Sequence, residues 1–399
     1  MNAQSIIKGK IHYVGVNDRT KHLFEALWPL PYGVSYNSYL IDDDDTVVLI
    51  DTVDICYFEV YLRKIKNIIG ERPIQYLVIN HMEPDHSGSI RLIKQHYPNI
   101  VIVGNKQTFG MIEGFYGVTG ERYMVNDGDY LALQHHKLRF FLTPMVHWPE
   151  TMMTFDEAEG VLFSGDAFGC FGTLDGGFLD ARINTERHHW DEMERYYSNI
   201  VGKYGSPVQK ALQKLSTLPV KAICSTHGPI WTGDNIPKVI GIYDRLSRYD
   251  TEPGVVIAYG SMYGNTEQMA ETIAAEISAQ GVRNVVMHNV SKSHSSYILA
   301  DIFRYRGLIV GSPTYNGQLF PEVEALLSKV MSRDIKNRYF GYFGSFCWAS
   351  AAVKRLCEFA EKSKFEVVGN PIEMKQSMSE LTYVQCEELG RDMATRILG

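Results

Sequence analysis

Residues 76–89 read YLVINHMEPDHSGS, and this stretch decides how the chain is interpreted. Its first four residues form a short apolar run that predicts a buried strand. Pro84 and Gly88 predict a loop rather than a helix for the polar residues that follow. Two imidazoles and two carboxylates stand in this loop, at His81, Glu83, Asp85 and His86. Such a group at one strand end suits one or two metal ions, whereas a solvated polar loop is the simpler alternative.

Length and composition limit the classes of protein that are possible. The 399 residues predict two or three domains, and 45% hydrophobic with 21% charged residues is ordinary for a globular protein. The formal net charge of -7 argues against nucleic acid as the main partner. No apolar run approaches the roughly 20 residues of a membrane span, and no secretory signal is visible, so we expect a cytoplasmic location. The six cysteines include no CxxC pair, which argues against a rubredoxin-like or zinc-ribbon module and fits a reducing compartment.

Further strands are predicted in the first part of the chain, and three of them lead to another metal-ligand side chain. They are predicted at 11–16, 38–41, 46–50, 100–103, 138–142, 161–163 and 220–224, and a helix is predicted at 58–69. The segments after strands 138–142, 161–163 and 220–224 contain His147, Asp166 and His227 respectively. Each alone could be ordinary turn chemistry, but their repetition predicts a binuclear site at one edge of a sheet sandwich. The Asp166 carboxylate is the natural bridge, because it has two oxygens to share.

The pattern His-x-Glu-x-Asp-His, followed by separate His, Asp and His loops, resembles the metallo-β-lactamase fold as flavodiiron proteins use it. Most hydrolases of that fold carry a His where this chain has Glu83. A carboxylate makes the site harder and more anionic than an imidazole does, which favours iron over zinc.

The resemblance implies a specific set of iron ligands. One iron would be held by His81, Glu83 and His147, the other by Asp85, His86 and His227, with Asp166 as the bridge. Family members differ over whether the residue at His86 binds metal, so this ligand stays open. The other nine of the 13 histidines, including the pairs at 135–136 and 188–189, are interpreted as surface or core residues. Trp148 and Trp231 follow metal-type loops and are expected either to wall the site or to pack in the core.

A domain boundary is predicted near residue 250, because the polar segment 245–254 ends in Pro-Gly. The predicted domains are therefore 1–250 and 251–399. Beyond the boundary, strands are predicted at 255–259, 284–287, 307–310 and 339–343, and a helix at 267–280. The alternation of strands with helix-length segments predicts a doubly wound α/β domain.

Three loops after strands of this second domain predict a flavin site. The loop 261–266 resembles the flavodoxin phosphate loop, although Tyr263 stands where Thr is usual, and it fits neither a GxGxxG nor a GxxxxGK[ST] pattern. The loops 311–317 and 344–349 also follow strands, and Tyr315 and Trp348 offer flat faces for an isoalloxazine ring. The predicted FMN-binding residues are Ser261, Met262, Tyr263, Gly264, Asn265, Thr266, Ser312, Pro313, Thr314, Tyr315, Asn316, Gly317, Ser345, Phe346, Cys347, Trp348 and Ala349.

Taken together, a metallo-β-lactamase-like αββα sandwich followed by a flavodoxin-like doubly wound parallel sheet resembles the core of the flavodiiron (A-type flavoprotein) family. The resemblance implies FMN, two iron ions, and an enzyme that reduces O2 to water, NO to N2O, or both. Because the chain ends at Gly399, we expect a separate electron donor, either rubredoxin or a reduced deazaflavin. The family also implies a head-to-tail homodimer or a dimer of dimers. Two alternatives remain: a metal-dependent hydrolase with an accessory flavodoxin-like domain, and a flavin electron carrier with a structural metal domain.

Overall fold

The computed structural model describes residues 5–7 and 10–399 and divides the chain into two compact units. The first unit comprises the chain up to residue 197 together with 206–244. The second comprises 198–205 and 245–399. A short segment from the middle of the chain thus belongs to the second unit, and the domain boundary at residue 250 stays a prediction.

The first unit contains two β-sheets. The first sheet has the order β1-β2-β7-β8-β9-β10-β11, and the second has the order β12-β13-β14-β15-β16-β17. The strands of the first sheet are β1 (Ser5–Ile7), β2 (Ile11–Tyr13), β7 (Tyr39–Asp43), β8 (Thr46–Ile50), β9 (Tyr76–Val78), β10 (Val101–Gly104) and β11 (Arg122–Met124). Those of the second are β12 (Tyr130–Ala132), β13 (Lys137–Leu142), β14 (Met152–Asp156), β15 (Val161–Gly165), β16 (Ala222–Ser225) and β17 (Trp231–Thr232). Two small ribbons pair β3 (Val16–Asp18) with β6 (Val34–Tyr36) and β4 (Leu23–Phe24) with β5 (Trp28–Pro29).

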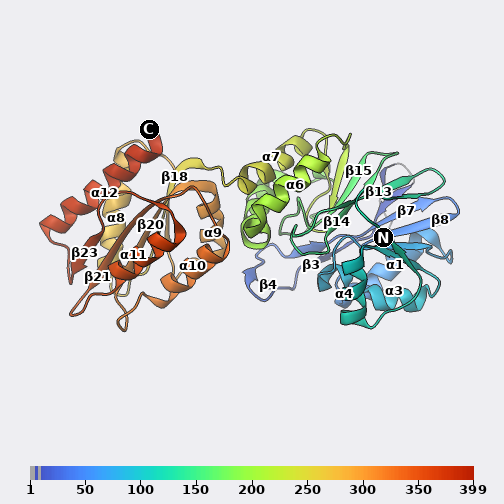
Figure 1. The fold of residues 1–399 in the computed structure, drawn as a ribbon, viewed down its shortest axis with the longest axis horizontal. Helices are drawn as coiled ribbons and strands as arrows, with labels where there is room; N and C mark the ends of the chain where they lie inside the picture. The colour runs from blue at the N-terminus through green and yellow to red at the C-terminus, as the bar shows by residue number, and fades with distance from the viewer. Residues whose placement is uncertain (1–4, 8–9) are drawn as a thin grey trace. The chain divides into compact units, whose positions relative to one another are not determined.

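Helices cover both outer sides of this sandwich. Helices α1, α3 and α4 lie on one side, and α6 and α7 lie on the other (Figure 1). The helices are α1 (Phe58–Ile69), α2 (Pro84–Ser87), α3 (Ile90–His96), α4 (Lys106–Tyr116), α5 (His189–Tyr196), α6 (Gly205–Leu215) and α7 (Asn235–Ser247). The core contains Val48 and Val78 from the first sheet and Phe140 and Phe163 from the second, because their side chains face each other across the sandwich. The αββα arrangement confirms the predicted fold class of this unit.

Local sequence rules explain several of these elements. The predicted helix at 58–69 is α1, whose buried residues Phe58, Tyr61, Leu62, Ile65 and Ile69 recur at helical spacing, and Gly70 follows its end. The predicted hairpin forms between β7 and β8, and its acidic turn is narrower than expected because Asp42 and Asp43 belong to β7.

One local prediction at the metal-type stretch was wrong. Residues Pro84–Ser87 form a single helical turn, α2, rather than an irregular loop. Pro84 stands at the first helical position, where its fixed φ suits a helix and its missing N–H would have had no partner. Gly88 also has a helical conformation. Proline here starts a helical turn instead of preventing one.

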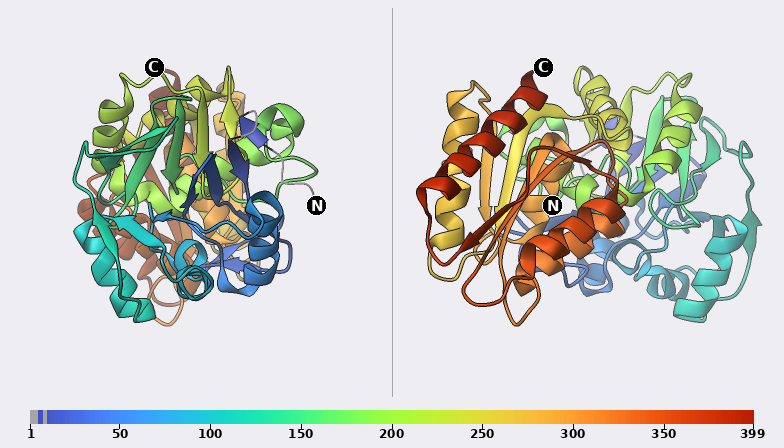
Figure 2. Two further views of the ribbon diagram at one scale, coloured as in Figure 1. Left: turned by 90° about the vertical axis from the view of Figure 1, so that its right-hand side faces the viewer. Right: turned by 60° about the vertical axis from the view of Figure 1, so that its left-hand side comes forward.

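The second unit is a parallel sheet with the order β19-β18-β20-β21-β22, and β23 pairs with β21. Helices α8 and α12 pack together on one side, and α9, α10 and α11 lie on the other (Figures 1 and 2). The strands are β18 (Glu252–Tyr259), β19 (Val285–Asn289), β20 (Tyr305–Pro313), β21 (Tyr339–Phe346), β22 (Glu366–Val367) and β23 (Ile372–Lys375). The helices are α8 (Asn265–Ala279), α9 (Ser295–Arg304), α10 (Pro321–Ser332), α11 (Ala352–Ser363) and α12 (Glu380–Leu398). This is the predicted doubly wound sheet.

Two of the predicted flavin loops are shorter than expected. β20 extends through Ser312 and Pro313, and β21 extends through Ser345 and Phe346, so these residues lie in strands. The register joins Pro313 to Ser345, which brings the ends of the two strands together. The pairing continues because both strands are central in the sheet, where the backbone of each finds partners on both sides.

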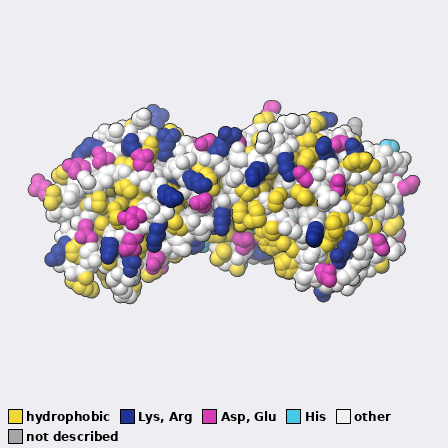
Figure 3. Space-filling view, viewed as in Figure 1, with side chains coloured by type: hydrophobic (Ala, Val, Ile, Leu, Met, Phe, Trp, Pro, Cys, Tyr) yellow, Lys and Arg dark blue, Asp and Glu magenta, His cyan; other side chains and the backbone are white. Residues whose placement is uncertain are grey.

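The surface carries charges of both signs. On the face drawn in Figure 3, acidic and basic side chains are interspersed over both units. Among the described residues, the structure contains no helix that is both long and apolar enough to cross a membrane.

Candidate metal centre and flavin pocket

The predicted metal ligands gather at the carboxyl ends of strands in the first unit. His81 to His86 follow β9, His147 follows β13, Asp166 follows β15 and His227 follows β16. Each of these seven residues is at most 7% exposed. Gly228, directly after His227, has φ of +78°, and a Cβ there would lie 2.4 Å from the Cys170 Sγ, so only glycine fits this turn.

Two groups of ligand atoms form within this cluster. The first comprises His81, Glu83, His147 and Asp166, and the second comprises Asp85, His86 and His227. In the first group, the Glu83 Oε2 lies 3.3 Å from the His81 Nε2 and 3.2 Å from the His147 Nε2. In the second, the Nε2 atoms of His86 and His227 lie 3.0 Å apart. Ligands about 2.1 Å from a common metal ion at right angles would lie about 3 Å apart, so this spacing suits coordination.

The Asp166 carboxylate lies between the two groups. Its Oδ2 lies 3.1 Å from the His147 Nε2, and its Oδ1 lies 3.0 Å from the His86 Nε2. One oxygen therefore faces each group, which is the arrangement that a bridging carboxylate needs.

Burial and charge also fit a pair of cations. Glu83, Asp85 and Asp166 bring three carboxylates into a site closed to water, and buried charges must be paired or coordinate a metal. Neither carboxylate oxygen of Asp85 has a hydrogen-bond partner among the described residues. Burial and the charge of Glu83 raise the pKa of Asp85 well above its usual value. The donor set of imidazoles and carboxylates suits iron, and two such ions would neutralise the site.

Hydrogen bonds from surrounding residues fix the ligands in place. The Glu150 Oε1 lies 2.9 Å from the His81 Nδ1 and accepts a hydrogen bond from the Met82 N–H. The His227 Nδ1 lies 2.8 Å from the Ser35 carbonyl oxygen. These contacts leave Nε2 of each ring free to bind a metal.

The bridging carboxylate is held in the same way. The Tyr196 hydroxyl donates to the Asp166 Oδ2 at 2.8 Å, and the Thr226 hydroxyl donates to the Oδ1. Sequence reasoning did not find Glu150, Ser35, Tyr196 or Thr226. Of these four residues, only Thr226 had a feature in the sequence that could have indicated its role, because it directly precedes His227.

The two tryptophans near the metal loops differ in role. The Trp148 ring makes an edge contact with the His81 ring at a centroid distance of 5.3 Å, so it walls the site. Trp231 is fully buried, stacks on Trp190 and donates to the Phe168 carbonyl, so it belongs to the core.

The second unit contains a pocket of about 810 Å³ at the carboxyl edge of its sheet. All the predicted flavin residues line it except Ser261, Gly264, Thr266 and Ser312, and it also includes Gln376 and Ser377. Sequence reasoning missed these last two because they follow β23, a strand that was not predicted.

The four residues outside the lining support the loops instead. The Ser261 hydroxyl accepts from the Gly264 N–H, and the Thr266 hydroxyl lies 2.9 Å from the Ser345 hydroxyl. The Ser312 hydroxyl accepts from the Phe320 N–H at 3.0 Å. The Thr266–Ser345 contact joins the start of α8 to the end of β21, and the Ser312 bond joins the end of β20 to the residue before α10.

The pocket suits a flavin cofactor, which has both a phosphate group and an aromatic ring system. Tyr263 and Trp348 are 90% and 89% exposed, which leaves two large aromatic faces open to a ligand. α8 begins at Asn265, and the N–H groups of its first turn favour a phosphate. The Thr314 hydroxyl accepts hydrogen bonds from the N–H groups of Ala351 and Ala352. These bonds fix the loop after β20 against the segment after β21.

In comparisons with known proteins, the two parts of the chain match different family models. A model of the ODP family beta lactamase matches residues 34–228, and a flavodoxin model matches residues 257–390. The anaerobic nitric oxide reductase flavorubredoxin of Escherichia coli O1:K1 is 32% identical over 395 residues, which cover 98% of this chain and 81% of the relative. None of these matches depends on the ligand geometry described above.

Solved structures give the same result for the whole chain. The rubredoxin oxygen:oxidoreductase of Desulfovibrio gigas superposes with a TM-score of 0.95 at 29% identity and covers 100% of this chain and 99% of that chain. The flavodiiron protein of Giardia intestinalis has a TM-score of 0.94 at 28% identity and covers 100% of this chain and 97% of that chain. The hydrolase alternative is not favoured by these relatives. With its metallo-β-lactamase-like and flavodoxin-like halves in this order, the chain belongs to the flavodiiron protein family and is an oxidoreductase that uses FMN and a diiron centre.

Proposed function

We propose that this enzyme reduces O2 to water, NO to N2O, or both, with electrons that a separate donor supplies through FMN. The observation that carries the proposal is Glu83, whose carboxylate lies within 3.3 Å of the Nε2 atoms of His81 and His147. A carboxylate at this position favours iron and distinguishes the site from that of most hydrolases of the fold. The names of two relatives, a nitric oxide reductase and an oxygen oxidoreductase, support both substrates.

The chain's own residues would divide the work between the two units. His81, Glu83 and His147 would hold one iron, Asp85, His86 and His227 the other, and Asp166 would bridge them. When bound, FMN would supply single electrons from a stored pair, and the iron pair would supply the redox chemistry that reduces the gas. Glu150, Tyr196 and Thr226 would keep the ligands oriented, and the burial of the centre would exclude bulk water.

Gas consumption by the purified holoenzyme tests the activity. We expect iron- and FMN-loaded protein, reduced by rubredoxin and its reductase, to consume O2 or NO at a gas electrode. The variant Glu83→His carries the ligand set of a typical hydrolase of the fold and should retain zinc better than iron and lose this activity. The exposed-residue variant Glu113→His is the control and should behave as the unmodified protein. Hydrolysis of esters or lactams by zinc-loaded protein, with no gas consumption by the iron form, would contradict the proposal.

Rubredoxin is the donor that we propose first, because the names of both relatives contain it. A reduced deazaflavin is the other candidate. Stopped-flow measurement of FMN reduction by each reductant distinguishes them: the physiological class should reduce the flavin at a rate that at least matches turnover, and the other should not.

We further propose a head-to-tail homodimer in which the FMN of one subunit supplies the diiron centre of its partner, and a cytoplasmic location for the enzyme. Two inactive variants test the dimer. Asp166→Ala removes the bridge between the metal groups, and Asn265→Glu places a negative charge at the exposed start of α8, where the FMN phosphate would bind.

The two variants are co-expressed with different affinity tags, and the mixed dimer is isolated. Electron transfer between subunits predicts recovered turnover, because the intact FMN of one chain faces the intact diiron centre of the other. A mixed dimer without activity, or a fully active monomer, would overturn the dimer proposal but would leave the assigned reaction standing.

A further inference from the structure

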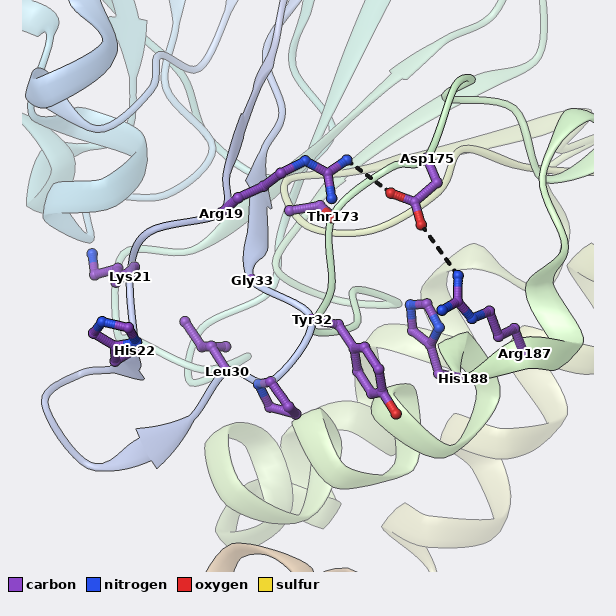
Figure 4. Close-up of a pocket in the computed structure, with 11 residues that line it drawn as sticks. Arg19, Lys21, His22, Leu30, Tyr32, Gly33, Thr173, Asp175, Arg187 and His188 are labelled. Atoms are coloured by element: carbon purple, nitrogen blue, oxygen red, sulfur yellow. Dashed lines mark hydrogen bonds and ion pairs between the residues drawn. The ribbon is translucent and has the colours of Figure 1, made fainter.

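The first unit contains a cavity of about 470 Å³ (Figure 4). It is separate from the flavin pocket of the second unit, and its lining includes none of the predicted metal ligands. Its volume falls within the range of roughly 300–1,000 Å³ that is usual for small-molecule sites. Its wall is formed by the segments 19–22, 30–33, 173–175 and 187–188. Nothing in the flavin or metal chemistry described above uses these residues.

The backbone around this cavity is firmly held. The Thr173 N–H donates to the Tyr32 carbonyl at 2.9 Å, and the Gly172 N–H donates to the Gly33 carbonyl at 3.0 Å. Gly33 has φ of +67°, and a Cβ there would lie 2.4 Å from the Asp18 carbonyl oxygen, so the turn requires glycine. The cavity wall is therefore a fixed feature of the fold.

Two arginines share a single carboxylate at one side of the cavity. Asp175 lies between Arg19 and Arg187, at 2.8 Å from the Arg19 Nη2 and 3.7 Å from the Arg187 Nη1 (Figure 4). Two guanidinium groups with one carboxylate leave an excess positive charge. Each guanidinium carries five N–H donors in a planar fork that suits carboxylate and phosphate groups, and Asp175 occupies only part of this capacity.

A buried histidine lies beside these arginines. His188 is 7% exposed, and neither of its ring nitrogens has a hydrogen-bond partner among the residues that the structure describes. One face of its ring stacks on Tyr32 at a centroid distance of 4.2 Å. The other face stacks on His189, also at 4.2 Å, so the ring lies between two aromatic neighbours and its nitrogens are buried within the cavity wall.

The apolar part of the cavity completes the site. Leu30 and Pro31 line the wall next to Tyr32, whose side chain remains 44% exposed. Lys21 contributes less charge than its position suggests, because its ammonium group donates to the Tyr36 hydroxyl and pairs with Asp54 at 3.4 Å. Positive charge therefore lies next to an aromatic and aliphatic surface.

We propose that this cavity binds a small organic anion whose phosphate or carboxylate group contacts Arg19 and Arg187 and whose flat apolar body lies against Tyr32 and Leu30. The anionic group would receive charge-assisted hydrogen bonds from the two guanidinium groups. The ring of the ligand would cover the exposed part of Tyr32.

Calorimetric titration of the FMN-saturated, iron-loaded holoenzyme tests the proposal. The probes are phenyl phosphate, benzoate and the neutral benzyl alcohol. We expect at least one of the two anions to bind with a Kd below about 1 mM and benzyl alcohol to bind at least about tenfold more weakly. The stronger of the two anions identifies the phosphate or the carboxylate class. Equal binding of the anions and the alcohol, or binding of none, would overturn the proposal.

Three variants locate the binding. Arg19→Gln and Arg187→Gln change exposed side chains and should each weaken anion binding by about tenfold. His188→Phe keeps the ring stacked on Tyr32 and removes only nitrogens that are buried in the cavity wall, so it should change binding little. Arg139→Gln changes an arginine that pairs with Glu157 outside the cavity and should leave binding unchanged. Anion binding that is the same in all four variants would place the anion elsewhere, for example at the iron, and would refute the assignment.

Discussion

The metal centre and the flavin pocket are built in opposite ways. Every predicted metal ligand is at most 7% exposed, and its neighbours hold it by hydrogen bonds. In the flavin pocket, by contrast, Tyr263 and Trp348 are about nine-tenths exposed. The metal ligands are thus preorganised within the fold, whereas the flavin pocket offers flat surfaces that a ligand would have to cover. The difference follows from the ligands: a metal ion needs atoms at fixed distances, and a large planar cofactor supplies its own shape.

The comparison predicts that the two sites fail independently, and the bridging carboxylate gives the largest effect. Asp166→Asn keeps the size of the side chain but removes the charge that faces both ligand groups, so we expect ferrous iron affinity to fall by about a hundredfold or more. FMN content should stay at the level of the unmodified protein. Iron analysis and the flavin absorbance spectrum measure both quantities on one sample. Loss of FMN together with iron would show that the two sites are coupled, contrary to this prediction.

Substitution of Glu150 should have the next largest effect, and it tests whether the two halves of the metal centre respond differently. The His81 ring is backed by this carboxylate, whereas the His227 ring is backed by the neutral Ser35 carbonyl. Glu150→Gln keeps a hydrogen-bond acceptor of the same shape but removes the negative charge, so iron affinity should fall by about 10- to 100-fold. Because the change acts through His81, Mössbauer spectroscopy should show one iron lost before the other. Equal loss of both irons would mean that the asymmetry has no effect.

The sequence indicated the cluster of metal-type side chains but not the residues that hydrogen-bond to them, and the reason is physical. His81, Asp166 and the other candidate ligands follow strands at a common sheet edge, and this placement produces a pattern along the chain. Glu150 and Tyr196 need only reach a ligand in space, so any element passing nearby can supply them. Tyr196 comes from α5, 30 residues after the carboxylate it contacts. Contacts of this kind leave no local spacing to detect.

The extent of the flavin loops was harder to predict for a similar reason. The strand signal ended at the last apolar residue, but β20 and β21 continue through Pro313 and Phe346 because each pairs with the other. β14 (Met152–Asp156) was also missed, since it is only five residues long and its polar residues, Thr154 and Asp156, are buried along with the apolar ones. Pairing between distant strands, rather than local preference, determines these boundaries.

Trp348 tests the exposed character of the flavin pocket. Trp348→Ala removes one of the two exposed aromatic faces and should lower FMN affinity by about tenfold, the usual effect of losing one stacking contact. Iron content should not change. Tyr383→Ala, which removes another half-exposed aromatic side chain of the same unit, is the matched control. Quenching of FMN fluorescence during titration of the apoprotein gives the affinities. If Trp348→Ala binds FMN as tightly as the control, the ring does not contact the flavin.

The smallest expected effect concerns a buried histidine of the first unit that pairs with a carboxylate outside the metal centre. The His136 Nδ1 lies 2.6 Å from the Asp156 Oδ2, and both side chains are buried. Burial alone would lower the pKa of His136, but the hydrogen bond and the charge of Asp156 outweigh it and raise the pKa above 6.5. The folded state therefore binds this proton more tightly than the unfolded state. Its contribution to stability is complete below about pH 6.5 and disappears as the pH rises through the raised pKa.

The free energy of unfolding of the first unit should consequently fall by about 1 kcal/mol for each unit by which the pKa is raised, once the pH exceeds that pKa. His136→Gln should remove this pH dependence, whereas His135→Gln changes the neighbouring exposed histidine and should keep it. Calorimetric unfolding between pH 6 and pH 9 measures the difference between the two variants. A pH dependence that persists in His136→Gln would assign it to other groups. If it disappears, the proton that His136 holds beside Asp156 accounts for this part of the pH dependence.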